Sequence, residues 1–235
     1  MAEHRKRKSS DRRVPVSVVR AKFAMTAVLL VVVIVMGALA FRRGQMRRKL
    51  SLPDSLDLVA VTVDGRELTL RDMAFYIAYE EGLIEEQARI YNPADTGAYW
   101  NIFTNHTFFR TLGRDTAMEM AVHDEIFYQM ALDEGIELNE EEEMRLANSQ
   151  YDFWSDLEED KRERLGAGEE DLKESMRRLA YAQKYQNLLA EMEGKGVEEY
   201  SVSGQTYQEM LEEHTVVIER NVWERVNFGG ITVDH

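Results

Sequence analysis

The sequence predicts a mainly helical protein, in which a single membrane-spanning helix precedes a helical domain closed by a small pair of strands. Three observations indicate this class. Residues 23–41 form an uncharged, largely apolar segment. Most of the chain after it places apolar residues at helical spacings of three and four, and the whole sequence has only three prolines. Alternating β-branched runs stand at 59–63 and 215–219, near the two ends of this second part.

The apolar segment from Phe23 to Phe41 has the length of a transmembrane helix. At the rise of an α-helix its nineteen residues span about 29 Å, close to the hydrocarbon thickness of a bilayer. A cleaved signal peptide is the competing interpretation, because Ala38-Leu39-Ala40 has the small-x-small pattern of a cleavage site. The length of the run and the basic residues that follow it favour an uncleaved anchor.

Charge predicts the orientation of the anchor. Residues 1–50 carry 13 basic and 2 acidic side chains, and more of the basic ones precede the span than follow it. This excess places residues 1–22, a basic tail, in the cytoplasm and the C-terminal part outside it. Because the chain carries −14 and residues 1–50 carry +11, residues 51–235 carry −25. Such an acidic domain is not expected to bind nucleic acid, because phosphate groups bind clustered cations.

The domain is expected to begin after a linker. Residues 42–57 read as a basic juxtamembrane linker, and residues 58–235 as one extracytoplasmic domain long enough to bury a core. The strand Val59–Val63 opens the domain, and Asp64-Gly65 follows it as a turn signal.

The first helix and the segment after it follow from local signals. Thr69 is expected to be the N-cap of a helix that runs to about Tyr91, because Thr69-Leu70-Arg71-Asp72 resembles a capping box. Asn92-Pro93 should stop that helix. Residues 93–112 are predicted to be irregular and are rich in aromatic residues.

The central helices are predicted from caps and apolar spacing. A helix over 115–134 is apolar around most of its circumference, which is typical of the central helix of a bundle, and Gly135 ends it. Asn139 should cap a second helix that reaches about Leu157.

The last helices and the final strand complete the domain. After a break at 166–168 a long helix is expected over 169–193, followed by a short one over 204–213. The strand at 215–219 then needs a partner, because a lone strand leaves backbone groups unpaired. We expect it to pair with residues 59–63 in a two-stranded element.

This order of elements resembles the N-terminal chaperone domain of SurA and of PrsA-type foldases. The opening Val61-Thr62-Val63-Asp64-Gly65 is similar to the family's first strand and turn. The run from Ala131 to Glu142, where an apolar helix ends at glycine and a capped acidic helix begins, is similar to its central signature. Leu172 to Met192 resembles the closing helix. The resemblance covers 59–235 and implies an exported chaperone domain onto which the segment 200–235 folds back.

One departure from this family concerns catalysis. SurA and PrsA-type proteins normally insert a parvulin prolyl isomerase domain after the closing helix. Only Glu193 to Ser203 stands at that place here, which is too short for a domain. The resemblance therefore implies no enzymatic activity, and an active peptidyl-prolyl isomerase is disfavoured.

The expected function is binding without catalysis. We expect a chaperone-like protein, anchored in the cell membrane through 23–41, that binds unfolded or exported polypeptides or one dedicated envelope protein. The alternative is a structural or docking subunit of a cell-envelope complex that reuses the same fold, since fold alone does not choose between functions. The chain has no cysteine, which excludes disulfides and thiol chemistry and is compatible with an exported bacterial protein.

Aromatic side chains are the candidate peptide-binding residues. They gather in two groups in the sequence, and a crevice for extended peptide is one interpretation of them. Burial in the core is the other, because aromatic residues dominate cores as well as interfaces. Twelve methionines would give such a crevice a deformable lining. The candidates are Tyr76, Tyr79, Trp100, Phe103, Phe108, Phe109, Tyr151, Phe153 and Trp154.

Motifs for catalysis or nucleotide binding are missing from the sequence, which contains no HExxH, GxSxG, P-loop or GxGxxG pattern. Glu119 and His123 stand one helical turn apart and could share a metal ion, but no third ligand is identifiable. An ordinary helix surface is the alternative interpretation of this pair. We expect no metal and no cofactor.

Overall fold

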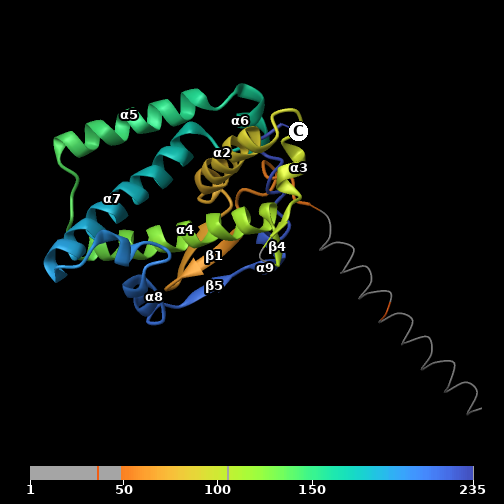
Figure 1. Ribbon diagram of the computed structural model, residues 1–235. Helices are drawn as coiled ribbons and strands as arrows, with labels where there is room; N and C mark the ends of the chain where they lie inside the picture. The colour runs from red at the N-terminus through yellow and green to blue at the C-terminus, as the bar shows by residue number, and fades with distance from the viewer. Residues whose placement is uncertain (1–35, 37–48, 105, 235) are drawn as a thin grey trace, which may run out of the picture. The chain divides into compact units, whose positions relative to one another are not determined.

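The computed structural model describes Met36, residues 49–104 and residues 106–234 (Figure 1). This part of the chain is mainly helical with small antiparallel sheets, as the sequence predicts. The predicted tail 1–22 and, Met36 apart, the predicted span 23–41 lie outside the described residues. Within the described ranges, no helix is both long enough and apolar enough to cross a membrane.

A three-stranded antiparallel sheet joins the two ends of the domain. Its strands are β1 (Val59–Val63), β2 (Arg66–Thr69) and β5 (Val216–Ile218), in the order β2–β1–β5. Val61 lies opposite Ile218 across the β1–β5 pair. The predicted pairing of the first and last strands is therefore confirmed.

The prediction of only two strands in this sheet is wrong. Asp64 and Gly65 both have positive φ, which closes a tight turn and lets the chain return at once as β2. Thr69 consequently ends β2 instead of capping a helix. Its backbone N–H and hydroxyl donate to the Asp72 carboxylate at 2.8 and 2.7 Å, so the cap-like contact exists but closes the turn before α2.

Helices make up the rest of the domain, and α4 is central among them because it packs against α2, α7 and β1. The segment predicted as irregular holds a short helix and a hairpin, and α4 begins at Phe109, earlier than predicted. The elements are α2 (Ala74–Tyr91), α3 (Gly97–Trp100), β3 (Phe103–Thr104), β4 (Thr107–Phe108), α4 (Phe109–Asp133), α5 (Glu140–Asp156), α6 (Glu159–Leu165), α7 (Glu169–Glu193), η1 (Val197–Tyr200), α8 (Gln205–Leu211) and α9 (Arg220–Trp223).

Local signals set the bounds of α5 and α7. Gly135, with φ 66°, follows α4. The Asn139 side chain accepts from the N–H groups of Glu141 and Glu142, and the Glu142 carboxylate accepts from the N–H of Asn139 at 2.8 Å. This capping box starts α5 as predicted. Gly194 ends α7 in the left-handed conformation.

The residues just before β1 belong to the domain rather than to a linker. We expected 42–57 to be a linker, but Leu52 and Leu56 are buried in the core. The N–H of Leu50 donates to the carbonyl of Arg225 at 2.8 Å. The chain is therefore fixed to the domain from about Leu50 onward.

The C-terminal segment returns into the core around a buried carboxylate. Glu81, on α2, is fully buried. One of its carboxylate oxygens accepts from the N–H groups of Gly229, Gly230 and Ile231 at 2.6, 3.1 and 3.3 Å. The other accepts from the N–H and the hydroxyl of Thr232 at 2.5 and 2.7 Å. We call this arrangement the Glu81 clasp.

The clasp depends on glycine at 229 and on the two acceptor oxygens of Glu81. Gly229 has φ 77°, and a Cβ there would stand 2.6 Å from the Trp100 ring, so a side chain does not fit. Burial raises the pKa of Glu81, while its hydrogen bonds from Thr232, Gly230 and Gly229 oppose that shift because they favour the charged form. Phe228 and Ile231 are buried beside the clasp.

Replacing the clasp carboxylate should destabilise the domain. In Glu81→Gln an amide NH2 faces backbone N–H donors, which leaves buried donors without an acceptor. We expect the free energy of unfolding to fall by roughly 1–3 kcal/mol. Glu86→Gln, on the exposed face of the same helix, should change it by less than about 0.5 kcal/mol. Chemical denaturation of residues 49–235, which form one compact unit, measures both; equal effects would contradict the clasp.

Candidate functional site

The nine candidate aromatic residues do not surround one crevice. Tyr76 and Trp100 are buried in the core. The Tyr76 hydroxyl donates to Asp124 at 3.1 Å, and the indole N–H of Trp100 donates to Glu85 at 3.0 Å. For these two residues the alternative interpretation, burial in the core, is confirmed. We therefore do not retain them as peptide contacts.

A second set lies on the β3–β4 hairpin. Phe103 and Phe108 face each other across it with ring centroids 5.2 Å apart, and both rings are exposed. Phe109, the first residue of α4, stacks on Tyr99 at 4.5 Å. Three of the candidates are therefore brought together at the start of α4.

The remaining four lie along α2 and α5. Tyr79 and Phe153 border a hollow of about 500 Å³, where Phe153 also packs on the core residue Phe75 at 5.1 Å. Tyr151 is exposed on α5. The Trp154 ring lies 4.5 Å from the Arg162 guanidinium in a cation–π contact. Most of these contacts are internal packing between elements.

A groove that the sequence analysis did not single out lies between α4, α8 and β5. It has a volume of about 530 Å³, and its walls are mainly apolar. We call it the β5 groove. It is lined by Met118, Glu119, Val122, Val202, Ser203, Tyr207, Gln208, Leu211, His214, Val216 and Ile218.

The strand beside the groove presents an open edge. Asp64 N–H donates to the Thr215 carbonyl, and Glu219 N–H donates to the Ala60 carbonyl, both at 2.9 Å. Bonded pairs alternate in an antiparallel ladder, so Val216 and Ile218 turn their N–H and C=O groups away from β1. In the described part of the chain no strand pairs with that side of β5.

A short contact fixes the start of β5. The Asp64 carboxylate lies 2.6 Å from Nδ1 of His214 and accepts from the N–H of Thr215 at 2.8 Å. These two hydrogen bonds lower the pKa of Asp64. Ser203 lines the same groove, but among the described residues it makes no hydrogen bond to His214, so the three groups are not joined as a catalytic triad.

Glu119 is the acidic group of the groove wall. It stands among the apolar side chains of Met118 and Val122. Partial burial, together with the negative charge of Asp115, raises the pKa of its carboxyl. Glu119 is therefore easier to neutralise than an ordinary surface glutamate.

His123, one helical turn from Glu119, packs against Tyr207 of the groove wall at a ring-centroid distance of 4.6 Å. It is buried, so the interpretation of this position as an ordinary helix surface is wrong. Its Nδ1 lies 2.9 Å from Asp124, and its Nε2 lies 2.8 Å from the Tyr200 carbonyl. Because a carbonyl only accepts, Nε2 carries a proton, and both ring nitrogens are already engaged. His123 is thus unsuited to ligate a metal together with Glu119.

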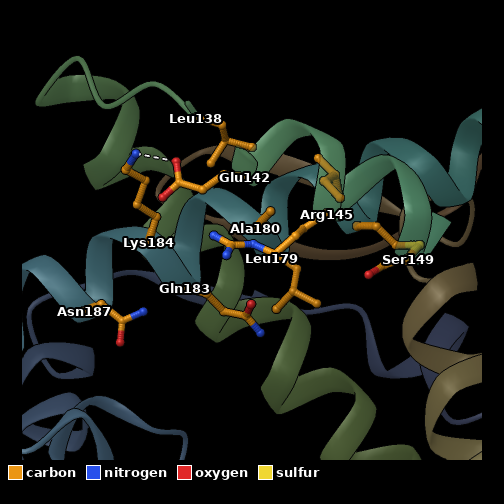
Figure 2. Close-up of a pocket in the computed structure, with 11 residues that line it drawn as sticks. Leu138, Glu142, Arg145, Ser149, Leu179, Ala180, Gln183, Lys184 and Asn187 are labelled. Atoms are coloured by element: carbon orange, nitrogen blue, oxygen red, sulfur yellow. Dashed lines mark hydrogen bonds and ion pairs between the residues drawn. The ribbon is translucent and has the colours of Figure 1, made fainter. Parts of the chain in front are cut away.

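A second hollow lies between α5 and α7 and measures about 440 Å³ (Figure 2). Figure 2 shows the Lys184 ammonium bonded to Glu142, at 2.6 Å. Lys184 also donates to the Glu137 carbonyl at 2.8 Å, and Glu142 belongs to the capping box of α5. These charges hold α5 on α7, which gives them a structural role.

The β5 groove is the better candidate because an apolar hollow and an unpaired strand edge meet there. The β-branched run at 215–219 predicts a strand but carries no signal for which of its edges is covered. The four-residue spacing of Tyr207 and Leu211 is the local signal for their shared face, and it is common to any amphipathic helix. None of the nine candidate aromatic residues lines this groove.

Apolar ligands should bind the groove more tightly at lower pH. Binding of an uncharged dye such as Nile red would remove water from Glu119. This removal is unfavourable when the carboxyl is ionised and costs less when it is protonated. Dye affinity should therefore rise as the pH falls through the raised pKa of Glu119. Glu119→Gln should flatten this dependence. A fluorescence titration of both proteins over a pH series decides it; an unchanged profile in the variant would contradict the assignment.

Comparisons with known proteins give no relative for this chain. No protein-family model, curated protein or solved structure matches it. The resemblance to SurA and PrsA-type domains consequently remains a prediction from the order of elements and their motifs.

Proposed function

We propose that the protein is a membrane-anchored, extracytoplasmic chaperone-like protein that binds extended polypeptide segments along β5, without catalysis. The single observation that carries the proposal is the open edge of β5 beside an apolar groove. The anchor is the apolar segment 23–41, and the orientation follows the excess of basic charge in 1–22.

An added strand would satisfy the free backbone groups of β5. The N–H and C=O groups of Val216 and Ile218 point away from β1, because bonded pairs alternate along the antiparallel β1–β5 ladder. Natural proteins commonly protect such edges with lysine, proline or a bulge. The sequence Val216-Val217-Ile218 carries none of these residues. Binding by strand addition uses such an edge for affinity and neighbouring pockets for side-chain selection.

The groove supplies the neighbouring pocket. Side chains of a strand alternate between its two faces, so an added strand would direct every second side chain to the groove side of the sheet. There Val122, Leu211 and Ile218 present apolar surface. The volume of about 530 Å³ suits large apolar side chains of the bound segment.

Charge favours a polypeptide partner over a second copy of the chain. Residues 51–235 carry −25, so two copies of the domain repel each other. A segment with basic residues beside its apolar ones is attracted instead. Unfolded exported chains present such segments before they fold.

Blocking the edge should abolish capture of unfolded protein. Ile218→Pro removes an N–H that faces away from β1, so the β1–β5 ladder keeps its hydrogen bonds. We expect the protein to suppress aggregation of an unfolded model substrate without ATP, and Ile218→Pro to lose most of that effect. Light scattering of the substrate with each variant measures it.

Two controls separate the edge from other causes. Ile218→Thr keeps the N–H and should retain much of the suppression, while Met144→Gln changes an exposed apolar residue on α5 and should retain all of it. Full suppression by Ile218→Pro, with its melting temperature unchanged, would show that β5 is not the binding edge. Stoichiometric recovery of one envelope protein from cells, with no aggregation suppressed, would instead support the docking-subunit alternative.

A further inference from the structure

An exposed apolar patch gathers at one end of the domain, around the start of α4. Phe103 and Phe108 face each other on the hairpin, and Phe108 precedes Leu112 by one helical turn. Tyr91, at the end of α2, adjoins them through Tyr99, whose ring lies 5.4 Å from Tyr91 and stacks on Phe109. Ile90 precedes Tyr91 in the same helix. We call Ile90, Tyr91, Phe103, Phe108 and Leu112 the end patch.

The large apolar side chains of the end patch are highly exposed to solvent. Ile90 is 81% exposed, Tyr91 65% and Phe103 61%. Large apolar side chains exposed near one another often mark protein–protein or membrane interaction sites. Figure 1 shows α3, β4 and the first turns of α4 at one end of the domain, while the start of α5 and the end of α7 lie at the other.

The chain enters the domain at this same end. Lys49 is the first described residue of the domain, and the positive charges of Arg110 and Arg114, in the opening turns of α4, lower its pKa together with partial burial. The Arg114 guanidinium also donates to the Glu224 carbonyl at 3.3 Å, and Leu50 bonds the next residue, Arg225. The end patch and the point of chain entry thus share α4.

Covalent connection keeps this end close to the membrane. The predicted span ends at Phe41, eight residues before Lys49. Even a fully extended chain of that length reaches at most about 29 Å. The end of the domain that holds Lys49 is therefore restricted to the neighbourhood of the bilayer surface whenever the anchor is inserted.

The chemistry of this end matches the bilayer interface. Tyr and Trp are enriched at the headgroup level of membranes, and Phe and Leu commonly form the apolar face of segments that lie in the bilayer interface. Although the domain is strongly acidic, Lys49, Arg110 and Arg114 gather at this end, with Asp115 beside Arg114 at 3.6 Å. Four arginines in 42–48 precede them. Basic residues next to a span are attracted to anionic lipid headgroups.

We propose that the end patch rests on the lipid bilayer, with Phe103 and Phe108 in the headgroup region, so that the domain lies against the membrane in one orientation. The partner is the bilayer surface itself rather than a client polypeptide. This inference rests on the membrane anchor of the proposed function but not on binding at β5. The β5 groove lies on other residues, and its edge stays available to polypeptide.

Site-specific fluorescence can test the contact in the full chain. The natural sequence has no cysteine, so Leu112→Cys gives one labelling site inside the end patch. Met144→Cys, exposed on α5, gives the matched site outside it. Each variant carries an NBD fluorophore in nanodiscs of phosphatidylcholine and phosphatidylglycerol, with and without doxyl-labelled lipids. We expect several-fold stronger quenching at 112 than at 144.

A variant of the patch tests the aromatic contribution. Phe103→Ser with Phe108→Ser, in the Leu112→Cys background, should reduce the quenching several-fold while the protein still co-elutes with the nanodiscs and melts as before. Equal quenching at 112 and 144 in an anchored protein would overturn the inference and leave the anchor standing. Protein that does not co-elute with the nanodiscs would overturn both.

The same double variant distinguishes the client alternative. If the end patch contacts lipid, aggregation suppression by the double serine variant should equal that of the unchanged protein. A loss of suppression together with weak quenching at 112 would show that the patch binds polypeptide, and the membrane assignment would be wrong.

Discussion

The clasp between Glu81 and the backbone of residues 229–232 is the interaction on which the rest of the domain depends. A carboxylate is very unfavourable in a protein interior unless it is fully hydrogen-bonded. Here every donor comes from the C-terminal segment, through four backbone N–H groups and the Thr232 hydroxyl. Helix α2 therefore cannot bury Glu81 unless that segment is in place, and the segment has no other acceptor for these groups in the described structure.

This mutual dependence positions both proposed binding surfaces. Because the C-terminal segment must return to α2, the residues before it lie along β1, and β5 becomes the outer strand of the sheet. Its open edge and the groove beside α8 follow from that return. The hairpin at the start of α4 lies at the end where the chain enters the domain, because Leu50 bonds Arg225 and Arg114 of α4 bonds the neighbouring Glu224. On our account the domain contacts lipid at that end and polypeptide along β5.

The elements that the sequence predicts well are those governed by neighbouring residues. Asn139 and Glu142 form a capping box within one turn, and Gly194 ends α7, so the starts and ends of these helices are local properties. The features that the sequence does not predict depend on contacts between residues far apart in the chain. The acceptor role of Glu81 depends on residues about 150 positions away in the sequence. Judged from its neighbours in α2 alone, Glu81 does not differ from an ordinary glutamate of an amphipathic helix. Burial of Trp100 depends likewise on Phe228 and Gly229.

Hydrogen exchange of the native protein, read residue by residue, tests the account most directly. The N–H groups of Gly229, Gly230, Ile231 and Thr232 should exchange as slowly as those of the central helix α4. Along β5 the N–H of Val217 should be protected, while those of Val216 and Ile218 should exchange quickly and become protected when an extended apolar peptide is added. Fast exchange throughout 229–232, or protection of Val216 and Ile218 before any peptide is present, would contradict the account.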